Sequence, residues 1–114
     1  MTTELQIETR QGGHAGQRVL RVVGKLGLET VPVFLDSVRA QTDPVVILDF
    51  NGVTYIDSAG VGSLVQTFAA FKKSQRRLAL TGLNERVQKV LEITRVQALL
   101  PSYPTVAEAE QNLV

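Results

Sequence analysis

The sequence predicts a single α/β domain, spanning 1–114, in which about four helices pack against a mixed, mostly parallel β-sheet. Two kinds of hydrophobic spacing alternate along the chain, one with the period of a strand and one with the period of a helix. The predicted order contains repeated strand-helix-strand crossovers, which place strands parallel. At 114 residues the chain has the size of one domain and can bury a core without metals or disulfides.

The first two elements are predicted to form a hairpin at the edge of the sheet. Leu5, Ile7 and Thr9 alternate with polar residues, which is the pattern of a strand with one covered face and one solvent-exposed face. Residues 11–17 supply three glycines to a turn, and residues 18–24 return as a valine-rich strand.

A first helix is predicted to begin at Thr30, which can cap it, and to stop before Asp43-Pro44. Pro32 is tolerated because it lies in the first turn, where its missing N–H is not needed. The apolar residues of this segment share one helical face: Val31, Phe34, Leu35 and Val38.

Residues 45–50 are almost continuously apolar, which favours a central strand covered on both faces. A loop is expected from Asn51 to Ser58. A second helix follows, and the cations at its C-terminal end complement the helix dipole. Its apolar stripe comprises Val61, Leu64, Val65, Phe68 and Phe71.

The last third of the chain predicts a strand at 77–81 and a helix capped by Asn84. A brief strand is expected near residues 98–100. Thr105 and Glu108 have the spacing of a capping box, which opens a final helix.

The most informative stretch runs from the central strand into the second helix, over residues 45–62. Binding sites in open α/β sheets gather beyond the C-terminal ends of strands, and helix N-termini offer free N–H groups. Ser58 stands where both features meet. Its purely structural interpretation is an N-cap, worth about 1 kcal/mol. Asp57 would then only favour the helix dipole, while Gly60 and Gly62 would only let the helix approach the sheet.

Residues 56–62, Ile-Asp-Ser-Ala-Gly-Val-Gly, resemble the signature of STAS domains, the anti-sigma factor antagonist family. Residues 24–32 and 80–94 resemble the family more weakly. In that family a partner kinase phosphorylates the serine after the motif aspartate, which implies phosphorylation of Ser58. The unmodified family member binds this kinase, an anti-sigma factor, so that the sigma factor is released.

The resemblance implies an anti-sigma factor serine kinase as the partner. The contact surface would comprise the motif and residues of the second helix expected to be exposed: Asp57, Ser58, Ala59, Gly60, Gly62, Ser63, Gln66 and Thr67. The chain departs from the family pattern at two places. Lys25 and Gly27 stand where acidic residues are usual, and Thr94-Arg95 stands where the family has Thr-Gly.

Composition argues against several other functions. The 12 Lys and Arg residues nearly balance the 11 Asp and Glu residues, so no global field gathers nucleic acid or an anionic membrane. The chain has no cysteine for disulfides or thiolate metal sites. No stretch reaches the ~18 apolar residues of a membrane span, and the first residues lack the apolar core of a signal peptide. We therefore expect a cytoplasmic protein that does not insert into membranes.

The chain is not expected to be an enzyme or to need a cofactor or metal. A serine hydrolase would require a base for Ser58, but the single histidine, His14, lies among glycines in the first turn. His14 alone is also a poor metal ligand. The one basic cluster, formed by Lys72, Lys73, Arg76 and Arg77, is interpreted as a solvated helix end.

Two hypotheses of different classes remain. The first is a regulatory antagonist that is switched off when Ser58 is phosphorylated. The second is an accessory or scaffold STAS subunit, in a stressosome-like assembly or beside a transporter, in which Ser58 is only a cap. The sequence leaves the oligomeric state open.

Overall fold

A computed structural model describes residues 5–114 as five strands, four α-helices and one short 3-10 helix. The elements are, in chain order, β1 (Leu5–Gln11), β2 (Gln17–Leu26), α1 (Val31–Arg39), β3 (Val45–Ile56), α2 (Ser58–Lys73), β4 (Arg77–Thr81), α3 (Glu85–Ile93), the 3-10 helix η1 (Gln97–Leu99), β5 (Ser102–Tyr103) and α4 (Val106–Asn112). None of the helices in this part of the chain is both long and apolar enough to cross a bilayer.

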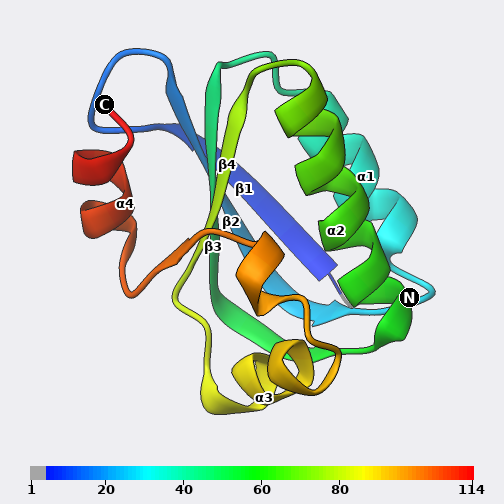
Figure 1. Cartoon of the computed structure of the whole chain (residues 1–114). Coiled ribbons are helices and arrows are strands. Elements are labelled where there is room, and N and C mark those ends of the chain that lie inside the picture. The colour runs from blue at the N-terminus through cyan, green and yellow to red at the C-terminus, as the bar shows by residue number, and fades with distance from the viewer. Residues whose placement is uncertain (1–4) are drawn as a thin grey trace.

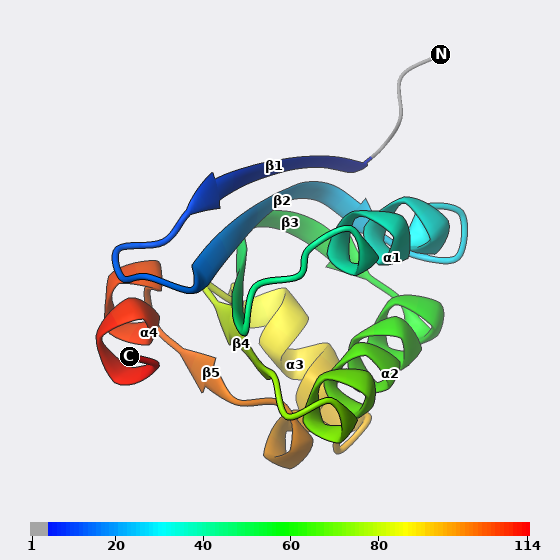
Figure 2. The same cartoon turned by 90° about the horizontal axis from the view of Figure 1, so that it is seen from above.

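The five strands form one sheet in the order β1-β2-β3-β4-β5 (Figure 1 and, with all five labelled, Figure 2). β1 and β2 pair antiparallel, whereas the β2–β3, β3–β4 and β4–β5 pairs are parallel. The predicted hairpin and the mixed, mostly parallel sheet are therefore confirmed. Because the strands β2 to β5 run in the same direction, their C-terminal ends lie at one edge of the sheet.

Helices cover both faces of the sheet, but unequally. Figure 2 shows α1, α2 and α3 on one side of the sheet and α4 on the other. The larger core lies under the first three helices, around Phe34, Phe50 and Leu64, all fully buried. A smaller core under α4 contains Ile47 and Ala109. This arrangement matches the covering of β3 on both faces that its apolar residues predict.

The expectation of a loop from Asn51 to Ser58 is wrong, because β3 continues to Ile56. Its second half pairs with the C-terminal half of β2, from Val23 to Leu26, after a shift in register. The Asn-Gly pair at the start of this half suggests a turn, but β2 is long enough to hold the segment in the sheet. β3 therefore leads into α2 through the single residue Asp57, without an intervening loop.

The brief strand expected near residues 98–100 is present, but its predicted position is wrong. Residues 97–99 form η1, and the strand β5 follows at Ser102–Tyr103. Ser102 and Tyr103 pair with Leu80 and Thr81 of β4, and the Pro101 carbonyl just before them accepts a hydrogen bond from the Leu80 N–H at 2.9 Å. Buried Leu100 is turned into the core instead.

Two of the predicted helix caps are confirmed and one is wrong. Asn84 accepts a hydrogen bond from the Val87 N–H at 2.9 Å, and Thr105 accepts one from the Glu108 N–H at 3.1 Å. Thr30 makes no capping bond to α1. Its hydroxyl instead donates to the Lys25 carbonyl and accepts from the backbone of the preceding loop, so it closes that loop.

The helices α2 and α3 end in the same way, with a residue in the left-handed conformation. Gln75 and Arg95 each have φ of 60°. After α3, the N–H groups of Arg95 and Val96 donate to the carbonyls of Glu92 and Leu91, the pattern of a Schellman motif. Glycine adopts this conformation without steric cost, so Arg95 is strained at the place where the family resemblance expects glycine.

We predict that Arg95→Gly stabilises the fold by about 0.5–1 kcal/mol, because relief of the left-handed strain outweighs the extra freedom of glycine in the unfolded chain. Urea unfolding measures the change. The control is Lys89→Gly, at an exposed position inside α3, which should cost about 1 kcal/mol. A loss of stability in Arg95→Gly would contradict the assigned conformation.

Candidate functional site

The candidate site lies at the start of α2, where β3 passes directly into the helix. Asp57 is the N-cap: its backbone is extended, and its Oδ1 accepts a hydrogen bond from the Gly60 N–H at 2.9 Å. The structural interpretation of Ser58 as the N-cap is therefore wrong. Asp57 already meets the need of the helix for a cap, and Ser58 becomes the first helical residue.

The second carboxylate oxygen of Asp57 joins α2 to the loop between β2 and α1. Oδ2 accepts a hydrogen bond from the Leu28 N–H at 3.2 Å. The Asp57 N–H in turn lies 3.4 Å from the Leu26 carbonyl oxygen, to which it donates. A Cβ at Gly27 would lie only 2.8 Å from Oδ2. Glycine at position 27 therefore leaves room for this carboxylate, which links the ends of two parallel strands.

Ser58 is exposed, and its hydroxyl forms no hydrogen bond with any residue between 5 and 114. The helix begins with its side chain outside the core, while the neighbouring carboxylate is occupied by two backbone N–H groups. The hydroxyl is thus accessible to another molecule.

The two glycines of the motif have different roles. A Cβ at Gly60 would lie 2.3 Å from the Leu26 carbonyl oxygen, so this glycine allows α2 to approach the end of β2. Gly62 is exposed, and nothing would lie within 4 Å of a Cβ placed there. The expectation that Gly62 allows close approach to the sheet is therefore wrong, and its position faces open space.

Two of the residues expected to be exposed on α2 are buried. Ser63 is 3% exposed and donates to the Gly60 carbonyl, and Thr67 is 6% exposed and donates to the Ser63 carbonyl, each at 2.7 Å. Both lie on the helix face turned toward the core, so they cannot take part in a contact surface. Gln66 is exposed as expected, and Ala59 is half-buried.

Two exposed apolar side chains lie beside the motif and were not singled out from the sequence. Leu28 is 75% exposed and Tyr55 is 44% exposed. With Asp57 and the β2–α1 loop they line a shallow hollow of about 320 Å³. The signal in the sequence was a leucine in an otherwise polar loop, but a single leucine does not show whether it packs inward or outward.

His14, in the turn between β1 and β2, lies far from Ser58 in space as well as in sequence. It is exposed next to the start of β2, whereas Ser58 comes two residues after Ile56, which pairs with the last residue of β2. The whole length of β2 therefore separates them. Within residues 5–114 no group of three or more His, Cys, Asp or Glu side chains is placed to hold a metal ion.

The basic cluster at the other end of α2 is only in part a solvated helix end. Arg76 donates to the carbonyls of Gln41 and Asp43, and its guanidinium lies 4.1 Å from the centre of the Phe71 ring. Arg76 therefore ties α2 to the segment before β3. Lys72 is exposed as predicted.

We predict that Gly60→Ala and Gly62→Ala have opposite effects on stability. Gly60→Ala should cost about 2–3 kcal/mol, because the added methyl group overlaps the Leu26 carbonyl and α2 has to shift. Gly62→Ala should stabilise by about 0.5–1 kcal/mol, since alanine favours an exposed helix. Thermal unfolding of both variants checks the pair, and equal effects would contradict the close approach at Gly60.

The chain is similar to known proteins along most of its length. Residues 6–109 match the family model of the STAS domain. The chain is 27% identical over 103 residues to the anti-sigma-B factor antagonist of Listeria monocytogenes, covering 88% of each chain. It is 29% identical over 84 residues to the anti-sigma-B factor antagonist of Staphylococcus aureus, covering 71% of this chain and 78% of that protein.

Solved structures share the fold. The anti-sigma factor antagonist from Mycobacterium paratuberculosis superimposes with a TM-score of 0.79 at 22% identity, covering 94% of this chain and 93% of the other. The anti-sigma factor antagonist SpoIIAA of Bacillus is similar in its unphosphorylated form, with a TM-score of 0.73 at 19% identity and coverage of 96% and 95%. Its phosphorylated form gives 0.69 at 18% identity, with 96% and 99% covered. From the family match over nearly its whole length, the chain belongs to the STAS domain family.

Proposed function

We propose that the chain is an anti-sigma factor antagonist, which binds an anti-sigma factor serine kinase around the start of α2 and is released when Ser58 is phosphorylated. The observation that carries the proposal is the exposed Ser58 hydroxyl, which forms no hydrogen bond within the described chain and follows a carboxylate that is already occupied. The curated relatives are named anti-sigma-B factor antagonists, which supports the same function.

The proposed contact surface joins the outer face of α2 to the neighbouring loop. Ser58, Gly62 and Gln66 are exposed and spaced four residues apart, so they lie along one side of the helix. Gly62 presents no side chain, which lets a partner approach the helix backbone closely. Leu28 and Tyr55 flank this strip as exposed apolar groups, the kind of side chain that anchors a protein interface.

The border of the surface is formed by the motif residues that hold the helix in place. Asp57 and Ala59 are half-buried on either side of Ser58. Gly60 is buried, and it supports the surface through its close approach to β2 and does not contact the partner. Ser63 and Thr67 are left out of the surface because both are buried.

Phosphorylation of Ser58 would be an ordinary phosphoryl transfer. The hydroxyl oxygen forms a bond to the γ-phosphorus of ATP held by the kinase, the bond from that phosphorus to the β–γ bridging oxygen breaks, and ADP leaves. The hydroxyl proton goes to a base of the kinase. The chain's own contribution is to present a hydroxyl at a fixed helix terminus.

The new phosphate would change binding and leave the fold intact. It adds a charge of about −1.5 to −2 at neutral pH, next to the Asp57 carboxylate and in the middle of the proposed surface. Two like unit charges ~4 Å apart repel by about 1 kcal/mol in bulk water and about 4 kcal/mol at an effective dielectric near 20. Because Ser58 is outside the core, the added group displaces no packed side chain.

We predict that incubation with the anti-sigma factor kinase and ATP adds one phosphoryl group to the wild-type chain, as measured by intact mass. Ser58→Ala should show no gain, since no other hydroxyl stands at the start of α2. The matched control is Ser102→Ala, at an exposed serine on β5, which should be modified like wild type. Phosphorylation of Ser58→Ala to the same extent as wild type would contradict Ser58 as the phosphorylation site.

We predict that Ser58→Asp binds the kinase at least about tenfold more weakly than wild type, because a fixed negative charge replaces a neutral hydroxyl. The kinase is used without nucleotide, so that it cannot phosphorylate the wild-type chain. Ser102→Asp carries the same charge outside the proposed surface and should bind like wild type. Calorimetric titration gives both constants. Equal binding by Ser58→Asp would instead favour a scaffold subunit without a switch.

A further inference from the structure

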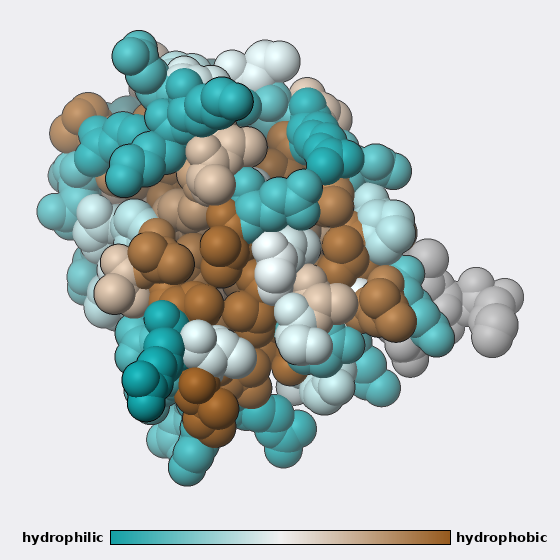
Figure 3. Space-filling view, turned by 45° about the vertical axis from the view of Figure 1, so that its right-hand side comes forward, coloured by the Kyte–Doolittle hydropathy of each residue, from teal (hydrophilic) through white to brown (hydrophobic). Residues whose placement is uncertain are grey.

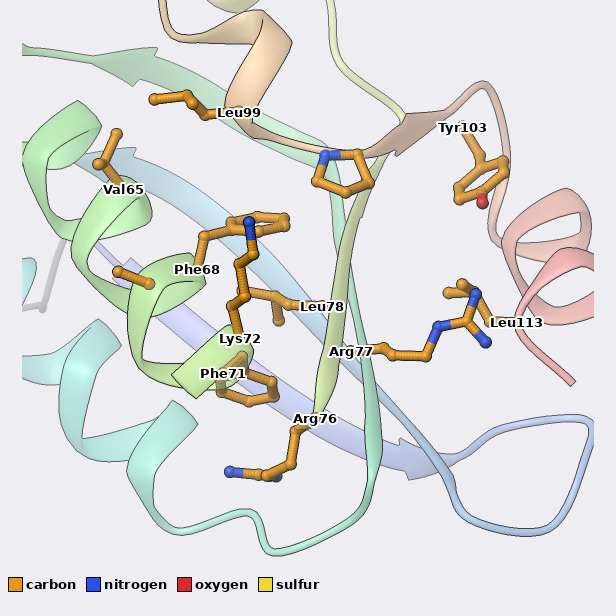
Figure 4. A pocket seen from close by; sticks show the side chains of 12 residues that line it. Val65, Phe68, Phe71, Lys72, Arg76, Arg77, Leu78, Leu99, Tyr103 and Leu113 are labelled. Atoms are coloured by element: carbon orange, nitrogen blue, oxygen red, sulfur yellow. The ribbon is translucent and has the colours of Figure 1, made fainter. Parts of the chain in front are cut away.

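One edge of the sheet is open beside the start of β4. β5 pairs only with Leu80 and Thr81, at the C-terminal end of β4, and no strand of the described chain lies next to residues 77–79 on the side away from β3. A groove of about 500 Å³ lies there, between the Lys72 end of α2, η1, β5 and the end of α4 (Figure 4). The helix rise places that end of α2 roughly 20 Å from Ser58, so the groove is separate from the proposed contact surface.

The backbone of Leu78 faces this groove without a hydrogen-bond partner. Successive residues of a strand direct their N–H and C=O groups to opposite sides. The Arg77 N–H donates to the Pro44 carbonyl, on the β3 side. The Leu80 N–H donates to the Pro101 carbonyl, on the opposite side. The N–H and C=O of Leu78 therefore point away from β3, and neither has a partner within the described chain. Leu78 is only 4% exposed, and unpaired backbone groups are rare at so buried a residue.

The groove reaches both faces of the sheet. Phe68 lines it on the face covered by α2, where the Leu78 side chain packs, and Tyr103 and Leu113 line it on the face covered by α4. Figure 3 shows apolar side chains gathered over the middle and lower part of the face turned toward α2, with polar side chains above them. A β-strand suits such a place, because its side chains alternate between the two faces while its backbone continues the sheet.

The charged groups of the groove are cations, and the two exposed ones lie on different faces. In Figure 4 Lys72 lies on the α2 side, and Arg77 points to the α4 side. Neither forms an ion pair within the described chain, and no Asp or Glu lines the groove. Arg76, the third cation of the lining, is held by two backbone carbonyls. Because adjacent residues of an added strand point to opposite faces, two consecutive acidic residues would meet one cation each.

The same charges argue against a second copy of this chain at the open edge. Two β4 strands related by a two-fold axis would pair antiparallel and bring their Arg77 side chains close together on one face. Like charges across a strand pair destabilise a sheet. A different protein that carries acidic residues at these positions would be attracted instead.

We propose that the open edge of β4 binds an extended segment of a partner protein, which adds an antiparallel strand and carries an apolar pair followed by two acidic residues. A residue opposite Leu78 in such a strand exchanges both backbone hydrogen bonds with it. The apolar pair would lie toward β5, against Phe68 and Tyr103, and the acidic pair toward the start of β4, against Lys72 and Arg77. The unpaired backbone of Leu78 carries the inference.

Hydrogen exchange of the full chain tests the geometry before any ligand is added. The Leu78 amide should exchange at least about tenfold faster than the Ala79 and Leu80 amides, although all three residues are buried, because only Leu78 lacks an acceptor. Equal protection of the three amides would overturn the proposal, since the Leu78 donor would then have a partner. Protection of Leu78 that grows with protein concentration would also overturn it, because it would assign the edge to a second copy.

The probe for binding is the peptide acetyl-Thr-Val-Leu-Glu-Glu-Thr-amide, titrated into the full chain at low salt and followed by amide NMR shifts. Saturable shifts are expected at Leu78 and Ala79 but not at Ser58, together with slower exchange of the Leu78 amide. A peptide with Gln in place of both Glu residues should bind about fivefold more weakly. The absence of saturable shifts at residues 77–79, or equal binding of the two peptides, would overturn the proposal.

Methylation of the peptide backbone tests whether the ligand adds as a strand. In a strand at the edge of a sheet every second amide faces the neighbouring strand, and the others face solvent. N-methyl groups on one alternating set of peptide amides should abolish binding, whereas N-methyl groups on the other set should be tolerated. Equal effects of the two sets would contradict an added strand.

Substitutions in the chain test the cations on the two faces. Lys72→Gln and Arg77→Gln should each weaken binding of the Glu-Glu peptide by about twofold, and the double variant should bind the Glu and Gln peptides equally. Lys73→Gln, at an exposed position outside the lining, is the matched control and should bind like wild type. Unchanged preference for the Glu-Glu peptide in the double variant would overturn the proposed acidic ligand.

The amide spectrum of each variant shows whether it is folded, so a loss of binding is assigned only to folded protein. The outcome is independent of the proposed regulatory function, because Ser58→Asp is expected to bind the peptide like wild type.

Discussion

The carboxylate of Asp57 is the interaction on which the arrangement of the candidate site depends. One oxygen accepts from the Gly60 N–H and caps α2, and the other accepts from the Leu28 N–H and holds the β2–α1 loop. Both bonds form where two parallel strands end side by side. A single side chain thereby fixes the start of a helix relative to the loop beside it.

The close approach of α2 to β2 brings the Asp57 carboxylate within hydrogen-bond distance of both N–H groups. A side chain at Gly60 or at Gly27 would collide with the Leu26 carbonyl or with Asp57 itself. Because both positions lack a side chain, the first turn of α2 lies against the end of β2. Ser58, the first residue of that turn, lies outside this contact and is exposed. The exposure of the serine is thus a consequence of how tightly its neighbours pack.

The two ends of α2 present opposite chemistry. Its N-terminal end carries a neutral hydroxyl beside a carboxylate that two N–H groups already satisfy. Its C-terminal end carries cations, one of which, Arg76, is held over Phe71, while Lys72 is exposed. Helix dipoles favour this placement of charge.

Local patterns in the sequence determined the order of the elements, the hairpin, the α2 stripe and the caps at Asn84 and Thr105, because spacing and capping chemistry act within a few residues. Only the tertiary structure decided that β3 runs to Ile56, that Asp57 caps α2 and that Ser63 faces the core. These features depend on β2 and its loop, which are distant in sequence. The tertiary structure alone also decided that β5 pairs with only Leu80 and Thr81, which leaves the start of β4 without a neighbouring strand on that side.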